Sequence, residues 1–486
     1  MNSSIKRNYI YSVLYQMLLI FVPLITAPYL TRVMGAEKLG IYSYTNSVAY
    51  YFYLFSMLGI SNYGNRSIAA VRDNKENLDK VFSELVIMQV SFGILVVCVY
   101  MIYICYLYIT HSIYLIPSII WSAYVVSGLF DINWFFWGIE KFSITVFRNI
   151  VIKILTTVGI FTLVRSQDDL YIYIGLISGS FIVSAVVLWP QIYRYVSFKF
   201  TKFSAAFSHF SSNFLLFIPV IAVSIYTVMD KIMLGQMSDM QNLGFYDNIQ
   251  KIMTVPTGLV TALGTVMLPR ISNLLVNGKQ SDATAYIDMS MQFSSFFSIA
   301  IALGLAAIAP TFTIIYFGSE FQGTSFMMEL FTITIIFIAW ANVVRTQYLI
   351  PSGRDKIYII SVCAGAIINV IINFILIPIM DEIGAVIGTI CAEISVAIIQ
   401  TWAVRKELPI NVFFKNSIIF IIPGIMMGTI VRFVGRYLGV TIISLTIQII
   451  LGIIVYGVCA GICLLRSETL LSKRINGALK KYLKRN

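Results

Sequence analysis

The chain has 486 residues, of which 58% are hydrophobic and 12% are charged, and its formal net charge is +12. Soluble proteins carry about 25% charged residues, so this composition excludes a water-soluble enzyme or binding domain. Apolar runs of roughly 20 residues recur along the chain, and each is long enough as a helix to cross a hydrocarbon core of roughly 30 Å. We therefore expect an all-α integral membrane protein.

The first apolar run follows Lys6 and Arg7 and is longer than the apolar part of a signal peptide, so we interpret it as an uncleaved span. Further runs bring the prediction to about fourteen transmembrane helices. In chain order the predicted spans are 9–30, 39–60, 82–108, 113–137, 144–164, 170–190, 213–235, 246–268, 288–316, 326–350, 357–378, 383–404, 416–438 and 440–465.

The distribution of basic residues predicts how these spans are oriented. With a cytoplasmic N-terminus, the inside segments hold 25 Lys and Arg when Arg148 near an inner span end is included, and the outside segments hold five when Arg432 and Arg436 near an outer span end are included. Cytoplasmic loops are enriched in Lys and Arg, so both termini are predicted to be cytoplasmic. The same rule assigns the positive net charge to loops, and no nucleic-acid partner is expected. Trp134 and Trp137, at the inner end of the fourth span, are expected in an interfacial belt.

No segment between spans is long enough to form a soluble catalytic or nucleotide-binding domain. The sequence contains no P-loop, dinucleotide-binding or H-E-x-x-H motif, so we expect no ATP site, no cofactor, no metal site and no catalytic residue. His111 and His209 lie at span edges, where solvated loop residues are expected. The six cysteines lie within apolar runs and are interpreted as small hydrophobic residues.

Two sequence patterns recur six spans apart. Leu39-Gly40-Ile41-Tyr42 after the first span matches Leu243-Gly244-Phe245-Tyr246 after the seventh, and 138–141 matches 353–356. An even period gives both copies the same orientation, so the copies are predicted to be related by a pseudo-twofold axis along the membrane normal. Two such six-helix lobes can rock and expose a central cavity to each side of the membrane in turn.

The repeat predicts the domain organisation. The predicted parts are an N-lobe at 1–195, a cytoplasmic linker at 196–212, a C-lobe at 213–406, two added spans at 407–466 and a basic amphipathic cytoplasmic tail at 467–486. Pairs of glycines four residues apart are expected to allow close helix packing. These pairs are Gly175/Gly179, Gly384/Gly388, Gly424/Gly428 and Gly457/Gly461.

Three segments carry a resemblance to a known family: "LTRVMGAEKLGIYSY", "DINWFFWGIEKF" from Asp131, and "VMDKIMLG" followed by "LGFYDNIQKI" from Val228. They resemble the polysaccharide transporter family, the Wzx-type flippases of O-antigen and capsule repeat units, which share a MATE-like fold with multidrug exporters and lipid II flippases. The resemblance implies a substrate of an oligosaccharide on undecaprenyl pyrophosphate, moved from the cytoplasmic to the outer leaflet of the bacterial cytoplasmic membrane. It also implies the polymerase and glycosyltransferases of that pathway as partners.

Ionisable residues inside spans are the candidate site residues, because each costs at least ~2.5–3.5 kcal/mol at the bilayer centre on insertion scales. Basic side chains lower the cost of desolvating a pyrophosphate. We therefore predict a cationic cavity with Lys153 as the central headgroup contact, Arg148 and Arg345 at the cytoplasmic entrance, and Arg32, Lys231 and Lys251 towards the outer end.

Buried carboxylates can titrate near neutrality, so Asp131, Asp230 and Glu393 are candidates for binding a coupling proton or sodium ion. The alternative is that these carboxylates pair with the cations and only fix helix packing. Tyr42 and Tyr51 in the second span are candidate sugar contacts. Packing against helices or lipid is the alternative for both tyrosines.

Three other functions compete with a flippase. A cation-coupled multidrug exporter of the same fold is expected to have an acidic cavity, against which Lys153 and Arg345 argue. A membrane polymerase or ligase acting on lipid-linked sugars needs a long outer loop, and none is present. A passive scaffold gives no reason to bury so many charges.

Overall fold

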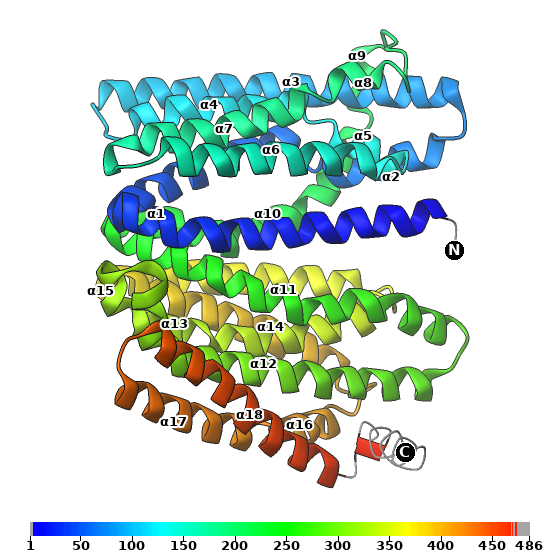
Figure 1. The fold of residues 1–486 in the computed structure, drawn as a ribbon. Coiled ribbons are helices and arrows are strands. Elements are labelled where there is room, and N and C mark those ends of the chain that lie inside the picture. Colours follow the sequence, from blue (N-terminus) through cyan, green and yellow to red (C-terminus); the bar gives the residue numbers. More distant parts are fainter. Residues whose placement is uncertain (1–2, 468, 470–471, 474–486) are drawn as a thin grey trace. The chain divides into compact units, whose positions relative to one another are not determined.

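The structure is a computed structural model that describes residues 3–467, 469 and 472–473, with side chains for all of these except 3–17, 19, 20 and 265. All regular structure in the described part is helical (Figure 1), which confirms the all-α prediction. The predicted amphipathic tail lies almost wholly outside the described residues.

The chain divides into two compact units, 1–244 and 245–486. The boundary falls within α11, whereas the lobe limits expected from the repeat lie at 195 and 213 and stay a prediction. The first unit holds α1 (Ser3–Met57), α2 (Ile60–Val71), α3 (Lys75–Ile109), α4 (Leu115–Phe130), α5 (Asn133–Gly138), α6 (Phe142–Leu163), the short helix η1 (Gln167–Asp169), α7 (Leu170–Val186), α8 (Trp189–Ile192), α9 (Phe203–Phe207), α10 (Phe210–Met237) and the start of α11 (Met240–Val276).

The second unit contains the remaining helices of the described part. They are the rest of α11, α12 (Gln280–Phe317), η2 (Ser319–Thr324), α13 (Ser325–Phe331), α14 (Ile333–Val344), the π-helix η3 (Arg345–Leu349), α15 (Asp355–Val404), α16 (Ile410–Ile418), α17 (Ile421–Leu438) and α18 (Ile442–Arg466). In this unit α12 is central, because it packs against α13, α14, α16, α17 and α18.

Eleven helical stretches of the described part are long and apolar enough to cross a membrane. One of these stretches, α15, consists of two helices joined at Asp381 (φ 49°). Helix α1 is not among the eleven, and it too consists of two helices, joined at Gly35 (φ 73°). The two arms of α1 coincide with the first two predicted spans, and the arms of α15 with the eleventh and twelfth. Every predicted span therefore coincides with a helical segment.

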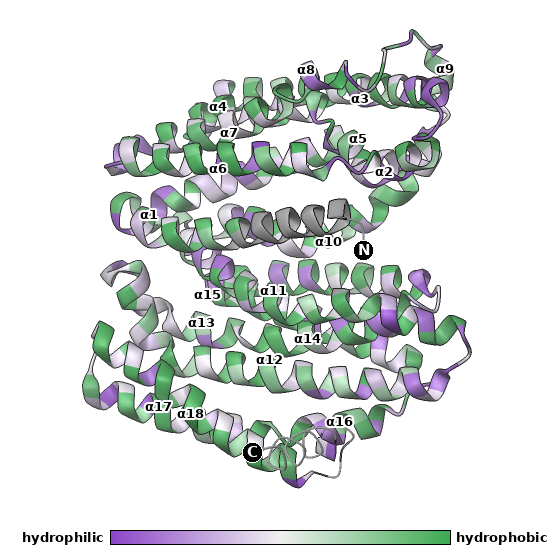
Figure 2. Cartoon of the chain, turned by 45° about the vertical axis from the view of Figure 1, so that its right-hand side comes forward, coloured by the Kyte–Doolittle hydropathy of each residue, from purple (hydrophilic) through white to green (hydrophobic). Residues whose placement is uncertain are grey.

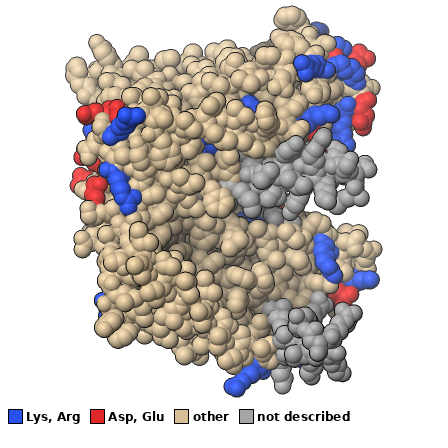
Figure 3. Space-filling view, in the orientation of Figure 1, with Lys and Arg blue, Asp and Glu red and all other residues tan. Residues whose placement is uncertain are grey.

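Within each unit, hydropathy and charge vary along the length of the long helices. Hydrophobic residues dominate the middle of the long helices, and hydrophilic ones gather at their ends and in the loops (Figure 2). The space-filling view shows the same division, with Lys, Arg, Asp and Glu concentrated at the helix ends (Figure 3). Charges near the middle of a helix are therefore few, which makes each of them a candidate for function.

The segment between the second and third predicted spans is not only a loop, because it contains α2. Ile60, Gly64 and Ile68 of α2 are buried at a helical spacing. The indole of Trp134 packs so closely on Gly64 that a Cβ on this glycine would lie 2.7 Å from it. Trp134 is fully buried, so its expected place in an interfacial belt is wrong, whereas Trp137 is 37% exposed.

The predicted glycine pairs differ in how closely they pack. Gly384 and Gly388 lie against the other arm of α15, where an added Cβ would collide with the backbone of Leu376 and with Asn373 Oδ1. The GxxxG pattern predicts that packing correctly. At Gly179, Gly457 and Gly461, in contrast, an added Cβ would have no described atom within 4 Å.

Candidate functional site

A polar network surrounds the break between α4 and α5 in the first unit. Asp131 follows the last residue of α4 with extended backbone. One carboxylate oxygen accepts hydrogen bonds from the backbone N (3.0 Å) and side-chain Nδ2 (2.6 Å) of Asn133. The other accepts one from the hydroxyl of Tyr53 on α1 (2.9 Å). The carboxylate therefore fixes the start of α5 against α1.

Arg148 of α6 joins this network and is only 6% exposed. Its Nη2 donates to Asn133 Oδ1 (2.9 Å), its Nε donates to Asn149 Oδ1 (3.0 Å), and its Nη1 donates to the Ser184 carbonyl on α7. Burying a guanidinium requires partners for its N–H donors, and these oxygens supply them. The contacts favour a role for Arg148 in positioning α5, α6 and α7, and its contact with substrate stays a prediction.

Lys153 lies further along α6 and differs from Arg148 in its surroundings. The side chain is half-buried, and no carboxylate or hydrogen-bond acceptor in the described part of the chain contacts its ammonium. Its backbone carbonyl accepts the ordinary helical hydrogen bond from the Thr157 hydroxyl (2.7 Å). An ammonium within a membrane helix needs water or an anion beside it. Lys153 is thus available to an anionic ligand.

Two further candidates lie on α10. Asp230 is fully buried and Lys231, the next residue, is half-buried. Asp230 lies close enough to Tyr51 of α1 to interact with it electrostatically. The Tyr51 hydroxyl donates to the Ser224 carbonyl (3.0 Å). The candidate sugar contact and the candidate coupling carboxylate are therefore neighbours at the contact of α1 with α10.

Tyr42 belongs to the core of the first unit. It is 9% exposed, and its ring centroid lies 4.6 Å from that of Tyr173 and 5.6 Å from that of Trp121. These separations are typical of packed aromatic pairs, which favours the packing alternative for this tyrosine. Arg32, in contrast, is exposed and donates to the Pro28 carbonyl one turn earlier (2.6 Å).

The second unit holds the remaining predicted charges. Arg345 begins the π-helix η3, and its guanidinium carbon lies 5.4 Å from the ring centroid of Tyr358. Arg345 also acts electrostatically on Glu393 of α15, without a direct ion pair in the described part. Lys251 forms an ion pair with Asp247 on α11 (2.6 Å), and Asp247 is almost fully buried. Both cations thus have an acidic neighbour, although that of Lys251 is not one of the three candidate carboxylates, and contact of either cation with substrate stays a prediction.

One histidine has a different environment from the one expected. His209 Nε2 lies 3.1 Å from a carboxylate oxygen of the buried Glu84, and its Nδ1 lies 2.7 Å from the Tyr63 hydroxyl. The prediction of a solvated loop residue is therefore wrong for His209, whereas His111 is exposed. The three side chains join α2, α3 and the start of α10.

The uncharged members of the network around Asp131 were missed by sequence reasoning. Gln89 of α3 donates from Nε2 to the carbonyls of Gly128 (2.7 Å) and Asp131 (3.0 Å), and its Oε1 accepts from Trp134 Nε1 (3.0 Å). A lone glutamine in an apolar span was the available signal, because a buried amide must find partners.

Comparison with known proteins identifies the family. Residues 5–275 match the family described as "Polysaccharide biosynthesis protein". The chain belongs to this family. A "Putative O-antigen transporter" of Escherichia coli (strain K12) is 23% identical over 414 residues, which cover 83% of this chain and 97% of that protein. The "Lipid II flippase MurJ" of Bacillus subtilis (strain 168) is 24% identical over 198 residues, covering 39% and 36% respectively.

Comparison with solved structures identifies the fold. A lipid II flippase MurJ in an inward closed conformation superposes with a TM-score of 0.71 at 18% identity, covering 94% of this chain and 98% of that one. An inward-facing multidrug resistance MATE family transporter gives a TM-score of 0.61 at 12% identity, covering 82% and 96%. The predicted MATE-like membrane fold is confirmed. The relatives named here are a transporter and flippases, in agreement with the expectation of a non-enzyme for this member of the polysaccharide biosynthesis protein family.

Proposed function

We propose that this protein is a flippase that moves an oligosaccharide linked to undecaprenyl pyrophosphate from the cytoplasmic to the outer leaflet of the bacterial inner membrane. Membership of the polysaccharide biosynthesis protein family and the O-antigen transporter relatives support a lipid-linked oligosaccharide as the cargo. The product would serve surface polysaccharide synthesis, with the polymerase and glycosyltransferases of the pathway as partners. Both termini are proposed to be cytoplasmic, from the distribution of Lys and Arg.

The observation that carries the proposal is the environment of Lys153. Its ammonium lies within an apolar helix without a described partner, whereas buried Arg148 on the same helix donates to three described residues. A pyrophosphate crossing a low-dielectric region gains most from a cation whose charge is not already compensated. We therefore assign Lys153 as the headgroup contact and Arg148 as a residue that fixes the helices around it.

Transport is proposed to be driven by a coupling ion that binds to buried carboxylates. Asp131 is held by hydrogen bonds from Asn133 and Tyr53, which suits a structural role. Asp230 and Glu393 are the stronger candidates for binding a coupling proton or sodium ion. Alternating access of the two predicted lobes would then couple that ion to movement of the headgroup.

The proposal is tested by reconstituting the full chain in liposomes and measuring transbilayer movement of fluorescent polyprenyl lipids. We expect movement of an oligosaccharide on undecaprenyl pyrophosphate and little movement of a phosphatidylcholine probe. An accompanying assay measures uptake of cationic dyes. Dye uptake without movement of the lipid-linked sugar would contradict the proposal and support the multidrug exporter.

A further inference from the structure

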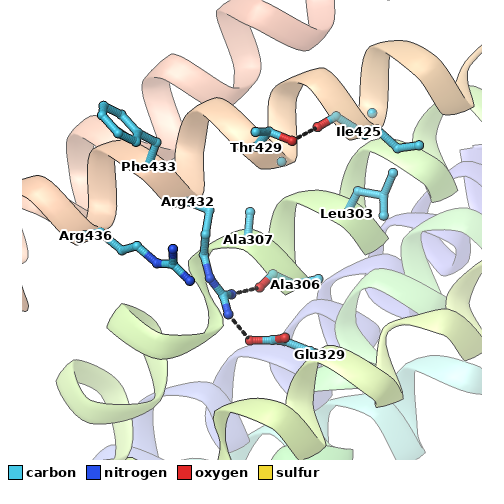
Figure 4. A pocket seen from close by; sticks show the side chains of 11 residues that line it. Leu303, Ala306, Ala307, Glu329, Ile425, Thr429, Arg432, Phe433 and Arg436 are labelled. Atoms are coloured by element: carbon cyan, nitrogen blue, oxygen red, sulfur yellow. Dashed lines mark hydrogen bonds and ion pairs between the residues drawn. The ribbon is translucent and has the colours of Figure 1, made fainter.

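A second basic site lies in the second unit, outside all of the residues assigned above. A pocket of about 470 Å³ opens between α12, α13 and α17. Arg432 and Arg436, one turn apart on α17, both extend into it, and Glu329 of α13 lies opposite (Figure 4). The apolar part of the lining includes Leu303 of α12 and Phe433 of α17.

Arg432 is held in place by the protein. Its Nη2 pairs with Glu329 Oε1 (2.7 Å), and its Nη1 donates to the Ala306 carbonyl (3.0 Å). These contacts use part of the donor set of the guanidinium and fix its plane, so the remaining N–H groups have a defined direction. The charge of Glu329 balances that of Arg432.

Arg436 adds a charge that the pocket does not balance. No hydrogen-bond acceptor or carboxylate of the described residues contacts it, and its side chain points toward the guanidinium of Arg432 (Figure 4). Like charges one helical turn apart repel each other. The pocket therefore carries one positive charge in excess, and an anion between the two guanidinium groups would remove the repulsion.

The surroundings of the pocket indicate the kind of anion. Phe433 is 71% exposed and Tyr437 is 84% exposed on the same helix, as expected for a surface that faces lipid. A tyrosine and two arginines near a helix end are typical of the headgroup level of a bilayer, where lipid phosphates lie. Gly428 also lines the pocket, and an added Cβ there would lie 3.7 Å from the Leu303 carbonyl oxygen, an ordinary contact distance, so a side chain fits at this position without a clash.

We propose that this pocket binds the phosphate of an anionic glycerophospholipid of the surrounding membrane. Arg432 and Arg436 hold the phosphate from two sides, and the apolar lining from Leu303 to Phe433 receives the start of the acyl chains. The site is separate from Lys153 and does not depend on the transported cargo. Its role is to anchor α17 to α12 and α13 through a lipid.

The test is native mass spectrometry of the full chain in detergent, titrated with phosphatidylglycerol or with phosphatidylcholine of the same acyl chains. We expect Arg436→Gln to weaken phosphatidylglycerol binding about tenfold, the loss of a charge-assisted contact, and to leave phosphatidylcholine binding unchanged. Gly428→Leu keeps both arginines and fills the pocket, so it is expected to have the same effect. Arg165→Gln removes another exposed arginine, from the first unit, and serves as the control.

Three outcomes would overturn the proposal. Equal binding of phosphatidylglycerol by Arg436→Gln, Gly428→Leu and the unchanged chain, with all three equally stable to heat, would show that the pocket holds no lipid. Displacement of the lipid by inorganic phosphate at similar concentrations would indicate a site for a free anion. Displacement by undecaprenyl pyrophosphate that depends on Arg436 would assign the pocket to the cargo instead.

Discussion

Gly40 and Gly244 occupy reciprocal positions at the crossing of α1 and the start of α11. A Cβ on Gly40 would collide with the carbonyl of Met240, and a Cβ on Gly244 would collide with the carbonyl of Ala36. The two glycines are the ones that the sequence repeat pairs, and Ala36 and Met240 stand at the same distance before them. Such reciprocity is what a local twofold relation between two copies of one segment produces.

This crossing predicts a sharp effect of a single methyl group. Gly40→Ala and Gly244→Ala each place a Cβ against a carbonyl that cannot move without shifting a helix, so each is expected to lower stability by about 1–3 kcal/mol. Gly179→Ala is the matched control, because an added Cβ there meets nothing within 4 Å. Thermal unfolding in detergent measures the difference. Equal melting temperatures for Gly40→Ala and Gly179→Ala would mean that the helices do not cross so closely.

The contacts of Arg148 predict that replacing it, even by lysine, lowers the stability of the protein. Arg148→Lys leaves at least two of the oxygens of Asn133, Asn149 and Ser184 without their donor, because an ammonium cannot reach in three directions as the guanidinium does. We expect a loss of about 2–3 kcal/mol, measured by thermal or denaturant unfolding in detergent. The reverse exchange, Lys153→Arg, is expected to leave stability nearly unchanged, because the Lys153 ammonium has no described partner to lose. A stable Arg148→Lys variant would refute the positioning role.

Acid sensitivity is predicted at the loop between α15 and α16. Burial raises the pKa of the Glu407 carboxyl, but hydrogen bonds from Tyr348 (2.7 Å) and Arg354 (2.7 Å) outweigh it and hold the pKa below its ordinary value. A depressed folded-state pKa contributes stability above the unfolded-state pKa, about 4.3 for Glu, and loses it as the pH falls through the folded value. Glu407→Gln should therefore lose less stability on acidification below about pH 4 than the unchanged chain.

The control for this prediction is Glu37→Gln, which removes an exposed carboxyl that forms no ion pair with a described basic residue. Thermal melting is followed at several pH values for all three proteins. If Glu407→Gln and the unchanged chain lose stability in parallel over the whole acidic range, the contacts of Glu407 do not lower its pKa.

The sequence predicted the spans well because apolar length is a local property. Even the breaks in α1 and α15 fell between predicted spans, since Gly35 and the Asp381-Glu382 pair interrupt the apolar runs. It failed where a residue's environment comes from distant parts of the chain. Trp134 was expected at the interface, yet its indole is buried on Gly64 and donates to Gln89. Nothing in the neighbouring residues reveals those partners.

The same reason limits the prediction of the site. Depth along a helix identified Lys153 and Arg148 together, because both interrupt one apolar segment. Only their contacts separate them, with Arg148 held by Asn133 and Ser184 while the described part supplies no partner to Lys153. A charge in a membrane helix is thus a candidate from sequence, and its partners decide between structure and function.

The measurement that tests the central claim most directly is transport of oligosaccharide-linked undecaprenyl pyrophosphate by Lys153 variants in liposomes. We predict that Lys153→Ala lowers the rate at least about tenfold without loss of stability, and that Lys153→Arg retains most of it. Lys279→Ala, which removes an exposed lysine, is the control. Transport by Lys153→Ala at the rate of that control would contradict the assignment of Lys153 as the headgroup contact.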